Sequence, residues 1–231
     1  MSAGIFVTGT DTGVGKTALA AAILRALVTD GVRAVGMKPV AAGIAPGATV
    51  NADVAALAAA GNVDAPRDER NPYSFGAAIA PHLAAAQARV AIDVEGIAAA
   101  YRRLAARADV IVVEGAGGVL VPIGPRADML DIAAALGLPV LLVVGMRLGC
   151  LNLALLAALA ISARGLPLAG WVANRIDPAM EAASANVAAL AERLPVPLVA
   201  DVAWREHGVP VLRLDGALRR ALRLGHDADS F

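Results

Sequence analysis

Short, continuously apolar runs alternate along this chain with longer segments in which apolar residues recur at helical spacing. Uninterrupted runs of this kind are typical of parallel strands that helices cover on both faces. Most runs are followed by a glycine, a proline or a polar residue, which ends the predicted strand. The pattern predicts strands over residues 3–8, 33–37, 109–113, 139–144, 167–173 and 196–199, with a short further strand over 119–123.

Helical patterns fill most of the intervals between these runs. They predict helices over residues 17–29, 52–60, 94–107, 129–136, 180–194 and 215–224, a long apolar helix that ends at 163, and another that Pro81 opens. Residues 40–49 and 61–70 are predicted to be loops, and the tail over 226–231 is expected to fray. This alternation indicates one α/β domain over 1–231, a doubly wound, mostly parallel sheet with helices on both faces in a Rossmann-type three-layer arrangement.

Composition limits the partners. The chain has 20 basic and 20 acidic residues, so no excess of charge favours a nucleic acid or a membrane surface. The longest apolar run, 132–146, is interrupted by Gly137 and Pro139 and is shorter than a membrane span requires. Cys150 is the only cysteine, which excludes an intrachain disulfide and a cysteine-based zinc site. With no visible signal peptide, these features predict a cytoplasmic protein.

The segment GTDTGVGKT at 9–17 lies between the first predicted strand and the first predicted helix. Gly13 and Gly15 have no Cβ, so the backbone can approach an anion closely, and amide N–H groups at the helix start point toward it. Lys16 can reach the β- and γ-phosphates of a nucleotide, and Thr17 can ligate Mg²⁺. The pattern predicts a phosphate-binding loop of the NTPase kind. The alternative is a strand-to-helix turn that binds no ligand.

One position departs from the common phosphate-loop pattern G-x-x-x-x-G-K-[ST]. Thr10 stands where that pattern has its first glycine, and Gly9 lies one residue earlier. The flanking strand and helix and the Gly-Lys-Thr ending still favour a nucleotide site.

Polar side chains follow several predicted strands at their carboxyl ends, among them Lys38, Glu114 and Asn174. The carboxyl ends of parallel strands meet at one edge of the sheet, where ligands bind in open α/β folds. We therefore expect Thr17, Asp53 and Glu114 to hold Mg²⁺ at the phosphates of a nucleoside triphosphate. Lys38 is expected to stabilise charge near the γ-phosphate, and Asn174 can read a base through its amide.

The sequence leaves a plainer interpretation open for each of three residues. Asp53 can serve only the dipole of the helix over 52–60, and Glu114 can be a solvated residue of a tight turn. Lys38 can be an exposed lysine at the end of a strand.

Covalent catalysis is not indicated. His82, His207 and His226 are scattered, and none lies beside a candidate nucleophile. Cys150 is expected to be buried and inert.

Several motifs in register give the chain a specific likeness to a known family. They are GTDTGVGKT at 9–17, KPVAAG at 38–43, NPYSF and APH at 71–75 and 80–82, VEGAGG at 113–118, RLGCLN at 147–152 and GWVAN at 170–174. In this set and order the chain resembles the dethiobiotin synthetases, the ATP-dependent cyclo-ligases of biotin synthesis. The resemblance runs from residue 5 to about 205.

The resemblance implies a reaction in which 7,8-diaminononanoate, CO₂ or bicarbonate, and ATP give dethiobiotin, ADP and phosphate. A substrate amine captures CO₂ as a carbamate, whose oxygen attacks the γ-phosphate to give a carbamic–phosphoric mixed anhydride. The second amine then closes the ureido ring. The resemblance also implies Mg²⁺ and a homodimer with the site at its interface.

Residue roles are carried over by motif. The resemblance assigns Thr12, Lys16 and Lys38 to the carbamate and γ-phosphate, and Thr17, Asp53 and Glu114 to the metal. The nucleotide-binding set that it implies is Gly13, Val14, Gly15, Lys16, Thr17, Ala18, Asp53, Glu114, Gly115, Ala116, Gly117, Asn174 and Arg175. The implied substrate set is Thr12, Lys38 and Ala42, together with Gly149, Cys150, Leu151 and Asn152, which open a helix in the other subunit and receive the distant carboxylate.

Three positions depart from the family pattern. Ala42 stands where KPVASG is frequent, so a hydroxyl that would contact substrate or phosphate is missing. Leu153 stands where LGCxNH is common, and Ala203 replaces the proline that often precedes Trp204.

Three other readings compete with this one. A cobyrinate-type amidoligase would need a glutamine-hydrolysing domain with a nucleophilic cysteine, for which 231 residues leave no room. A nucleotide-switch ATPase of the partitioning or septum-positioning kind would carry a second lysine early in its loop, GKGGxGKT, where this chain has Asp11. A nucleotide-binding protein without catalysis is suggested only by Ala42.

Overall fold

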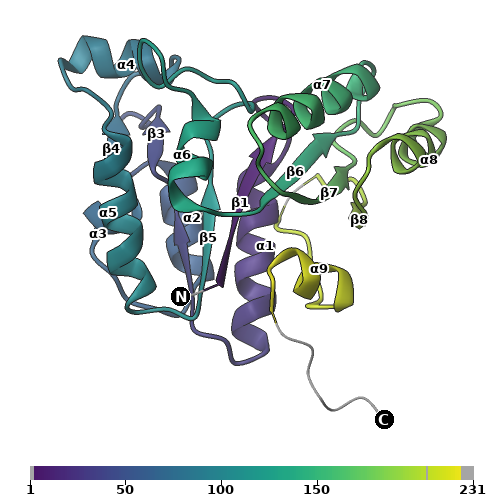
Figure 1. Ribbon diagram of the computed structural model, residues 1–231, viewed down its shortest axis with the longest axis horizontal. Coiled ribbons are helices and arrows are strands. Elements are labelled where there is room, and N and C mark those ends of the chain that lie inside the picture. The colour runs from purple at the N-terminus through teal and green to yellow at the C-terminus, as the bar shows by residue number, and fades with distance from the viewer. Residues whose placement is uncertain (1–2, 207, 225–231) are drawn as a thin grey trace.

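The computed structural model describes residues 3–206 and 208–224 and contains a parallel sheet of order β2-β5-β1-β6-β7-β8 (Figure 1). Its strands are β1 (Ala3–Gly9), β2 (Ala34–Met37), β5 (Val110–Glu114), β6 (Val140–Gly145), β7 (Leu168–Asn174) and β8 (Leu198–Val202). Every neighbouring pair in this sheet is parallel, as the continuous apolar runs predict.

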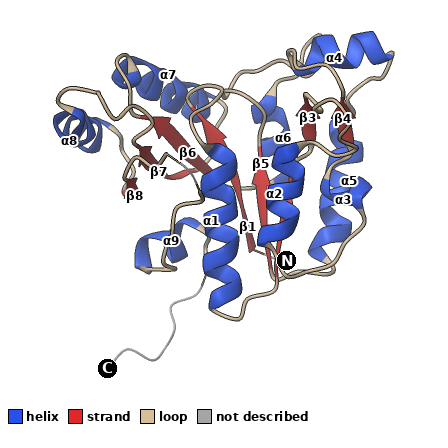
Figure 2. Ribbon diagram, turned by 180° about the vertical axis from the view of Figure 1, so that it is seen from behind, coloured by secondary structure: helices blue, strands red, loops and turns tan. Residues whose placement is uncertain are grey.

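Helices cover both faces of the sheet. Figure 2 shows one face with α1 (Lys16–Thr29), α2 (Ala52–Ala60) and α9 (Gly216–Ala221). The other face carries α5 (Val94–Ala105), α6 (Met129–Leu136), α7 (Cys150–Ala163) and α8 (Ala183–Arg193). The predicted doubly wound α/β fold is therefore confirmed.

Successive residues of each strand pack into two different cores. In β1, Ile5 and Val7 belong to the cluster that packs against α1, whereas Phe6 belongs to the cluster on the side of α5 and α6. All five residues of β5 are buried. A strand covered on both faces has no position for a polar side chain until it ends, which explains its uninterrupted apolar run.

The predicted loops contain short elements that the sequence analysis missed. The segment over 40–49 begins with β3 (Val40–Ala42), which pairs in parallel with β4 (Tyr73–Phe75) in a second, two-stranded sheet. The segment over 61–70 ends in α3 (Arg67–Arg70). Elements of three or four residues are too short to show a helical or strand periodicity in the sequence. Strand β3 pairs with β4 only because the tertiary fold brings the two segments together.

Other boundaries shift by a few residues. Residues 119–123 form no strand, and only an isolated bridge joins Pro122 to Asp128. Helix α8 begins at Ala183 instead of 180, and β8 is displaced toward the carboxyl end of the predicted 196–199. Pro81 opens α4 (Pro81–Ala88) as predicted. The tail over 226–231, with His226, and the isolated His207 lie outside the described residues.

The topology places the first loop at the centre of the carboxyl edge. Strand β1 lies between β5 and β6, and the chain fills the sheet first on the β5 side and then on the β6 side. Ligands of doubly wound sheets bind where the strand order reverses in this way.

None of the helices in the described part of the chain combines the length and the apolar character that a membrane span requires.

Candidate active site

The loop between β1 and α1 has the backbone of an anion-binding turn. Gly13 and Gly15 adopt positive φ values of 76° and 89°, which favour glycine. A Cβ on Gly15 would lie 2.2 Å from Asn174 Nδ2, so a side chain there would displace the Asn174 side-chain amide. Gly15 is also the N-cap of α1 and provides no side-chain acceptor, so the first-turn amides of α1 are available to a ligand.

Neighbouring strands hold this loop in place. Asn174, at the end of β7, donates from Nδ2 to the carbonyl of Val14 over 2.8 Å. The side chain of Asp11 pairs with Arg147, which follows β6, and the Asp11 carbonyl accepts a hydrogen bond of 2.9 Å from Lys16 Nζ. The side-chain amide of Asn174 therefore donates one hydrogen bond to the loop, in addition to any contact that it makes to a base.

Lys38 is the centre of a buried charge cluster. Its side chain is 5% exposed, and its Nζ lies 2.6 Å from Glu114 Oε1 and 2.9 Å from Asp53 Oδ2. Glu114 is 1% exposed. The plainer interpretations of these three residues are therefore wrong: Lys38 and Glu114 are not solvated, and Asp53 does more than complement the dipole of α2.

Asp53 reaches the cluster because α2 starts at a defined residue. Asn51 caps that helix by accepting hydrogen bonds from the amides of Asp53 and Val54 over 3.0 and 3.4 Å. The cap places Asp53 in the first turn, where its carboxylate meets Lys38.

The residues present fit a magnesium ion. Thr17 Oγ1 donates to Glu114 Oε1 over 2.8 Å, and Glu114 Oε2 is buried without a hydrogen-bond partner among the described residues. An unpartnered buried carboxylate oxygen beside a hydroxyl and the Asp53 carboxylate is the hard oxygen donor set that Mg²⁺ prefers. The described residues hold no group of three or more His, Cys, Asp or Glu placed for a metal, so phosphate oxygens and water would complete the coordination.

The two lysines of the site carry their charge differently. Burial disfavours the charged form of Lys16 and lowers the pKa of its ammonium group to about 8, although Glu114 acts in the opposite direction. Burial also opposes the charge of Lys38, but the carboxylates of Glu114 and Asp53 outweigh it and raise the pKa of Lys38 above its ordinary value. Burial is the largest single influence on Asp53 and would raise its pKa, but the charge of Lys38 and the hydrogen bonds from Lys38 and Thr17 together outweigh it and lower that pKa.

These groups line an open pocket of about 820 Å³ at the carboxyl edge of the sheet. The predicted residues that line it are Thr12, Gly13, Gly15, Lys16, Thr17, Ala18, Lys38, Ala42, Asp53, Glu114, Ala116 and Gly117. The remaining lining is apolar and was not predicted: Ala78, Ile79, Ala80, Pro81 and Val121. The APH motif at 80–82 marked this segment, but its periodicity gave no sign that it forms a wall of the site.

Several predicted residues lie outside this lining. Val14 is buried beneath the loop, and Gly115 packs against Phe6. Arg175 is held by a bidentate pair with Asp201, at 2.9 and 2.8 Å.

The predicted set over 149–152 opens α7, next to Arg147. Gly149 is the N-cap, with φ 93°. Burial raises the pKa of the Cys150 thiol, which accords with an inert cysteine.

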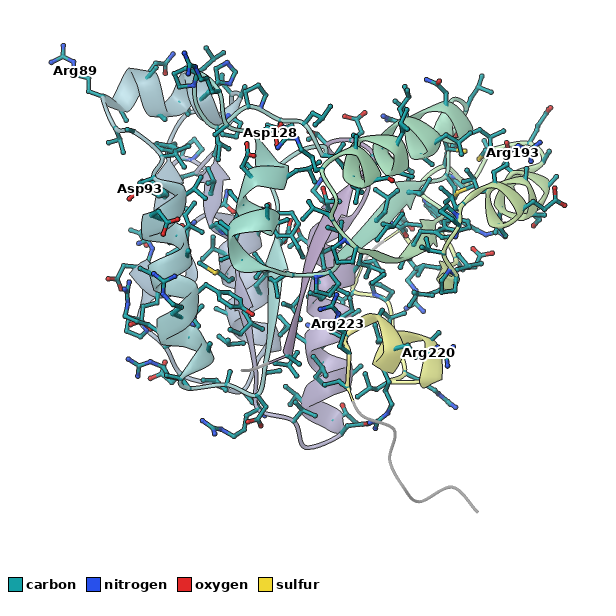
Figure 3. The ribbon with its side chains drawn as sticks, in the orientation of Figure 1. Arg89, Asp93, Asp128, Arg193, Arg220 and Arg223 are labelled. Carbon is teal, nitrogen blue, oxygen red and sulfur yellow. The ribbon has the colours of Figure 1, made fainter. Side chains whose placement is uncertain are left out.

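Lysine usage is a signal that the sequence analysis overlooked. Lysine occurs at only two positions, 16 and 38, and both line the pocket. All the other basic residues counted in the chain are arginines. Figure 3 shows Arg89, Arg193 and Arg220 at the periphery, extending away from α4, α8 and α9. Ammonium groups of side chains are thus concentrated in the site.

Comparison with known proteins gives the family. The family described as "AAA domain" matches residues 3–210. The ATP-dependent dethiobiotin synthetase BioD of Nitrosospira multiformis is 54% identical over 199 residues, 86% of this chain and 87% of that protein. The protein of the same name from Aromatoleum aromaticum is 54% identical over 196 residues, 84% of this chain and 87% of its own.

Solved structures share the fold at much lower identity. A ParA family ATPase from Chlorobium tepidum superimposes with a TM-score of 0.56 at 13% identity, covering 89% of this chain and 86% of its own. The MinC:MinD cell division complex of Aquifex aeolicus gives 0.54 at 16% identity, with coverages of 89% and 83%. These likenesses concern the fold alone, whereas identity above half along most of both chains is decisive for the family. The chain belongs to the ATP-dependent dethiobiotin synthetase family.

Proposed function

We propose that this chain, acting as one nucleotide-binding domain, closes the ureido ring of dethiobiotin from 7,8-diaminononanoate, CO₂ and ATP. The observation that carries the proposal is the buried ammonium of Lys38. It lies between Glu114 and Asp53 in the same pocket as the phosphate loop, in a chain 54% identical to proteins named for this reaction.

The phosphate loop and α1 bind the triphosphate. Amide groups around Gly13 and Gly15 surround the phosphate oxygens, and the N-terminus of α1 favours their negative charge. The amine of Lys16, now hydrogen-bonded to the Asp11 carbonyl, turns to the β- and γ-phosphates. Thr17, Asp53 and Glu114 hold Mg²⁺, which when bound neutralises charge that develops on the phosphates.

Lys38 and Thr12 hold the carbamate beside the γ-phosphate. The substrate nitrogen bonds to the carbon of CO₂ and loses a proton, and a carbamate oxygen then bonds to the γ-phosphorus as the bond to the ADP oxygen breaks. The positive charge of Lys38 stabilises the carbamate anion and also the negative charge that develops on the γ-phosphoryl group during its transfer. The second amine bonds to the same carbon, inorganic phosphate leaves, and this nitrogen gives up a proton.

The apolar wall suits the aliphatic part of the diamine substrate. Ala42, Ile79 and Val121 line the same pocket as the charged cluster. An apolar lining with few, precisely placed polar groups is what orients a small amphiphilic ligand. Ala42 contributes a methyl group here and no hydroxyl, so Thr12 and Lys38 provide the polar contacts.

A homodimer supplies the remaining contact. Leu148 is 95% exposed beside the start of α7, and Leu156 and Leu159 on the same helix are 55% and 65% exposed. Leu156 and Leu159, three residues apart, lie on one face of α7, and an exposed apolar helix face is typical of a surface that another protein covers. The uncapped N-terminus of α7 at Gly149 would then face the substrate carboxylate in the neighbouring subunit.

The test follows labelled bicarbonate into product together with ADP release, each with and without the diamine. We expect Lys16→Ala and Lys38→Ala to abolish incorporation, and Arg193→Ala, which changes an exposed arginine of α8, to retain it. Circular dichroism of each variant reports whether it folds. Turnover retained in both lysine variants, or ADP release independent of the diamine in the unaltered protein, would remove the proposal.

A further inference from the structure

The backbone of Lys38 is hydrogen-bonded outside the main sheet. The pairing of β2 with β5 ends with Met37 opposite Val113, one residue before Lys38. The amide of Lys38 donates to the Arg70 carbonyl over 2.8 Å, and the Lys38 carbonyl accepts a bond of 2.7 Å from Nδ2 of Asn71. The last residue of α3 and its C-cap Asn71 therefore provide the hydrogen-bond partners of the Lys38 backbone, in place of a neighbouring strand.

Asn71 contributes both of its side-chain donors to this junction. Its Nδ2 also donates to the Tyr73 carbonyl over 2.9 Å, and the residue is buried. Asn71 Oδ1, by contrast, finds no partner in the described parts of the chain. An unpaired buried acceptor is unfavourable, so the contribution of this amide lies in the two donors that it directs at backbone carbonyls.

Ion pairs to α5 and a backbone hydrogen bond within α3 hold the segment that carries Asn71. Glu69, two residues before Asn71, is buried and pairs with Arg103 of α5 and with Arg107, which follows that helix, at 3.2 and 3.3 Å. The backbone N–H of Asn71 donates to the Arg67 carbonyl over 2.7 Å and so caps the C-terminus of α3. The hydrogen-bonded chain therefore runs from α5 through α3 and Asn71 to the Lys38 backbone.

We propose that Asn71 is a positioning residue that fixes the Lys38 backbone so that its ammonium group sits between Glu114 and Asp53. The described lining of the pocket does not include Asn71, so it acts through Lys38 and not on the substrate. Its effect on turnover rests on the proposed function of Lys38, but its effect on the placement of Lys38 does not.

The same strand offers a matched control. Asn62 holds the other end of β2: its Nδ2 donates to the Val32 carbonyl over 3.0 Å, and its Oδ1 accepts from the Ala34 amide over 2.8 Å. Asn62→Asp and Asn71→Asp thus change the same chemical group at opposite ends of one strand, and only the second is at the end that borders the site.

The first measurement reads the placement of Lys38 without activity. Protein labelled with ¹³C at the lysine ε-carbon gives two side-chain signals, because lysine occurs only at 16 and 38. Lys16→Ala leaves the Lys38 signal and so assigns it. At a fixed pH of 7, we expect Asn71→Asp to shift or broaden the Lys38 signal, and Asn62→Asp to leave it in place. Asn71→Ala replaces Asn71→Asp if the latter does not fold.

The second measurement separates kcat from KM. Displacing a charged group by about 1 Å can cost on the order of 100-fold in rate, so kcat should fall toward that limit while the KM for ATP stays within about twofold. An unmoved Lys38 signal in both Asn71 variants, or a KM change without loss of kcat, overturns the positioning role. If the unaltered protein forms no product, the proposed function fails, and the lysine signal still decides the role of Asn71.

Discussion

At the residue scale, the site is a cluster of opposite charges removed from water. Lys38 and Glu114 are both almost fully buried, and each is the principal counter-charge of the other at 2.6 Å. Such a pair adds little net stability, but removing one partner leaves an uncompensated charge in the interior. The cluster is therefore a place where a single substitution affects folding as well as chemistry.

Lys38→Met should destabilise the ligand-free protein by about 3–5 kcal/mol, because Glu114 loses its cation. Adding Glu114→Gln should recover most of this stability without restoring turnover. Urea denaturation of the two variants and the parent at pH 7 measures the difference. A single variant as stable as the parent, or a double variant no better than the single one, would contradict this account.

Protonation of the two lysines should differ in the ligand-free protein. The Lys16 signal of ε-¹³C-lysine protein should titrate with a midpoint near pH 8, whereas that of Lys38 should move only above the ordinary lysine range. Since the unfolded chain holds the Lys16 proton more tightly, this group makes stability rise with pH from about 8 to 10.5. Lys38 has the opposite effect: its contribution to stability is full below the ordinary lysine pKa of 10.5 and is lost as the pH rises from there through its raised pKa. Coincident titrations would refute the assignment.

At the scale of elements, the starts of two helices and the outward surface of one of them are the features that matter for function. Both α1 and α7 begin at a glycine with positive φ and have no side-chain cap, which leaves first-turn amides available. By contrast, α6 begins with a full capping box from Asp128 and Asp131, which also pair with Arg164. The two helix starts at a glycine with positive φ thus coincide with the proposed phosphate and carboxylate sites.

The outward surface of α7 should form the dimer interface. The double variant Leu156→Glu and Leu159→Glu places like charges on that surface and should raise the dimer dissociation constant at least about 100-fold. Sedimentation at micromolar concentration measures it. Leu83→Glu, on the exposed side of α4, is the control and should remain dimeric. A monomeric parent protein would end the interface proposal.

At the scale of the whole molecule, the site depends on strands that are distant in sequence. The pocket draws on the ends of β1, β2 and β5 and on the segment before α4, which the parallel sheet and the small β3–β4 sheet bring to one edge. Ligand binding there should stabilise the entire fold, since β1, β2 and β5 all belong to its two cores.

ATP with Mg²⁺ at about 100 times its dissociation constant should stabilise the protein by about 2.7 kcal/mol, or roughly 5–10 °C in Tm. Removing the metal with EDTA should lower this shift, as should Glu114→Gln, and Lys16→Ala should abolish it. Thermal unfolding followed by circular dichroism gives the values. A full shift in the presence of EDTA would argue against the metal role of Glu114.

The polar residues that line the pocket could be predicted because each of them has a local signature. The phosphate loop is one continuous segment, and Lys38 and Glu114 are the first polar residues after a buried apolar run. Asn51 is a residue typical of a helix N-cap and so predicts the start of α2. Because all strands of the main sheet run in the same direction, their carboxyl ends lie at one edge and bring these positions together. The apolar wall before Pro81 and the support from Asn71 carry no such signature.

The sequence by itself therefore determined the fold class, the phosphate loop and the residues of the charge cluster, because strand and helix periods and strand ends are local properties. Only the tertiary structure decided that β3 pairs with β4, that Asn71 holds Lys38, and that residues 78–81 close one side of the pocket. The physical reason is that a three-residue strand or a single amide is stabilised by partners elsewhere in the chain. A local pattern contains no information about those partners.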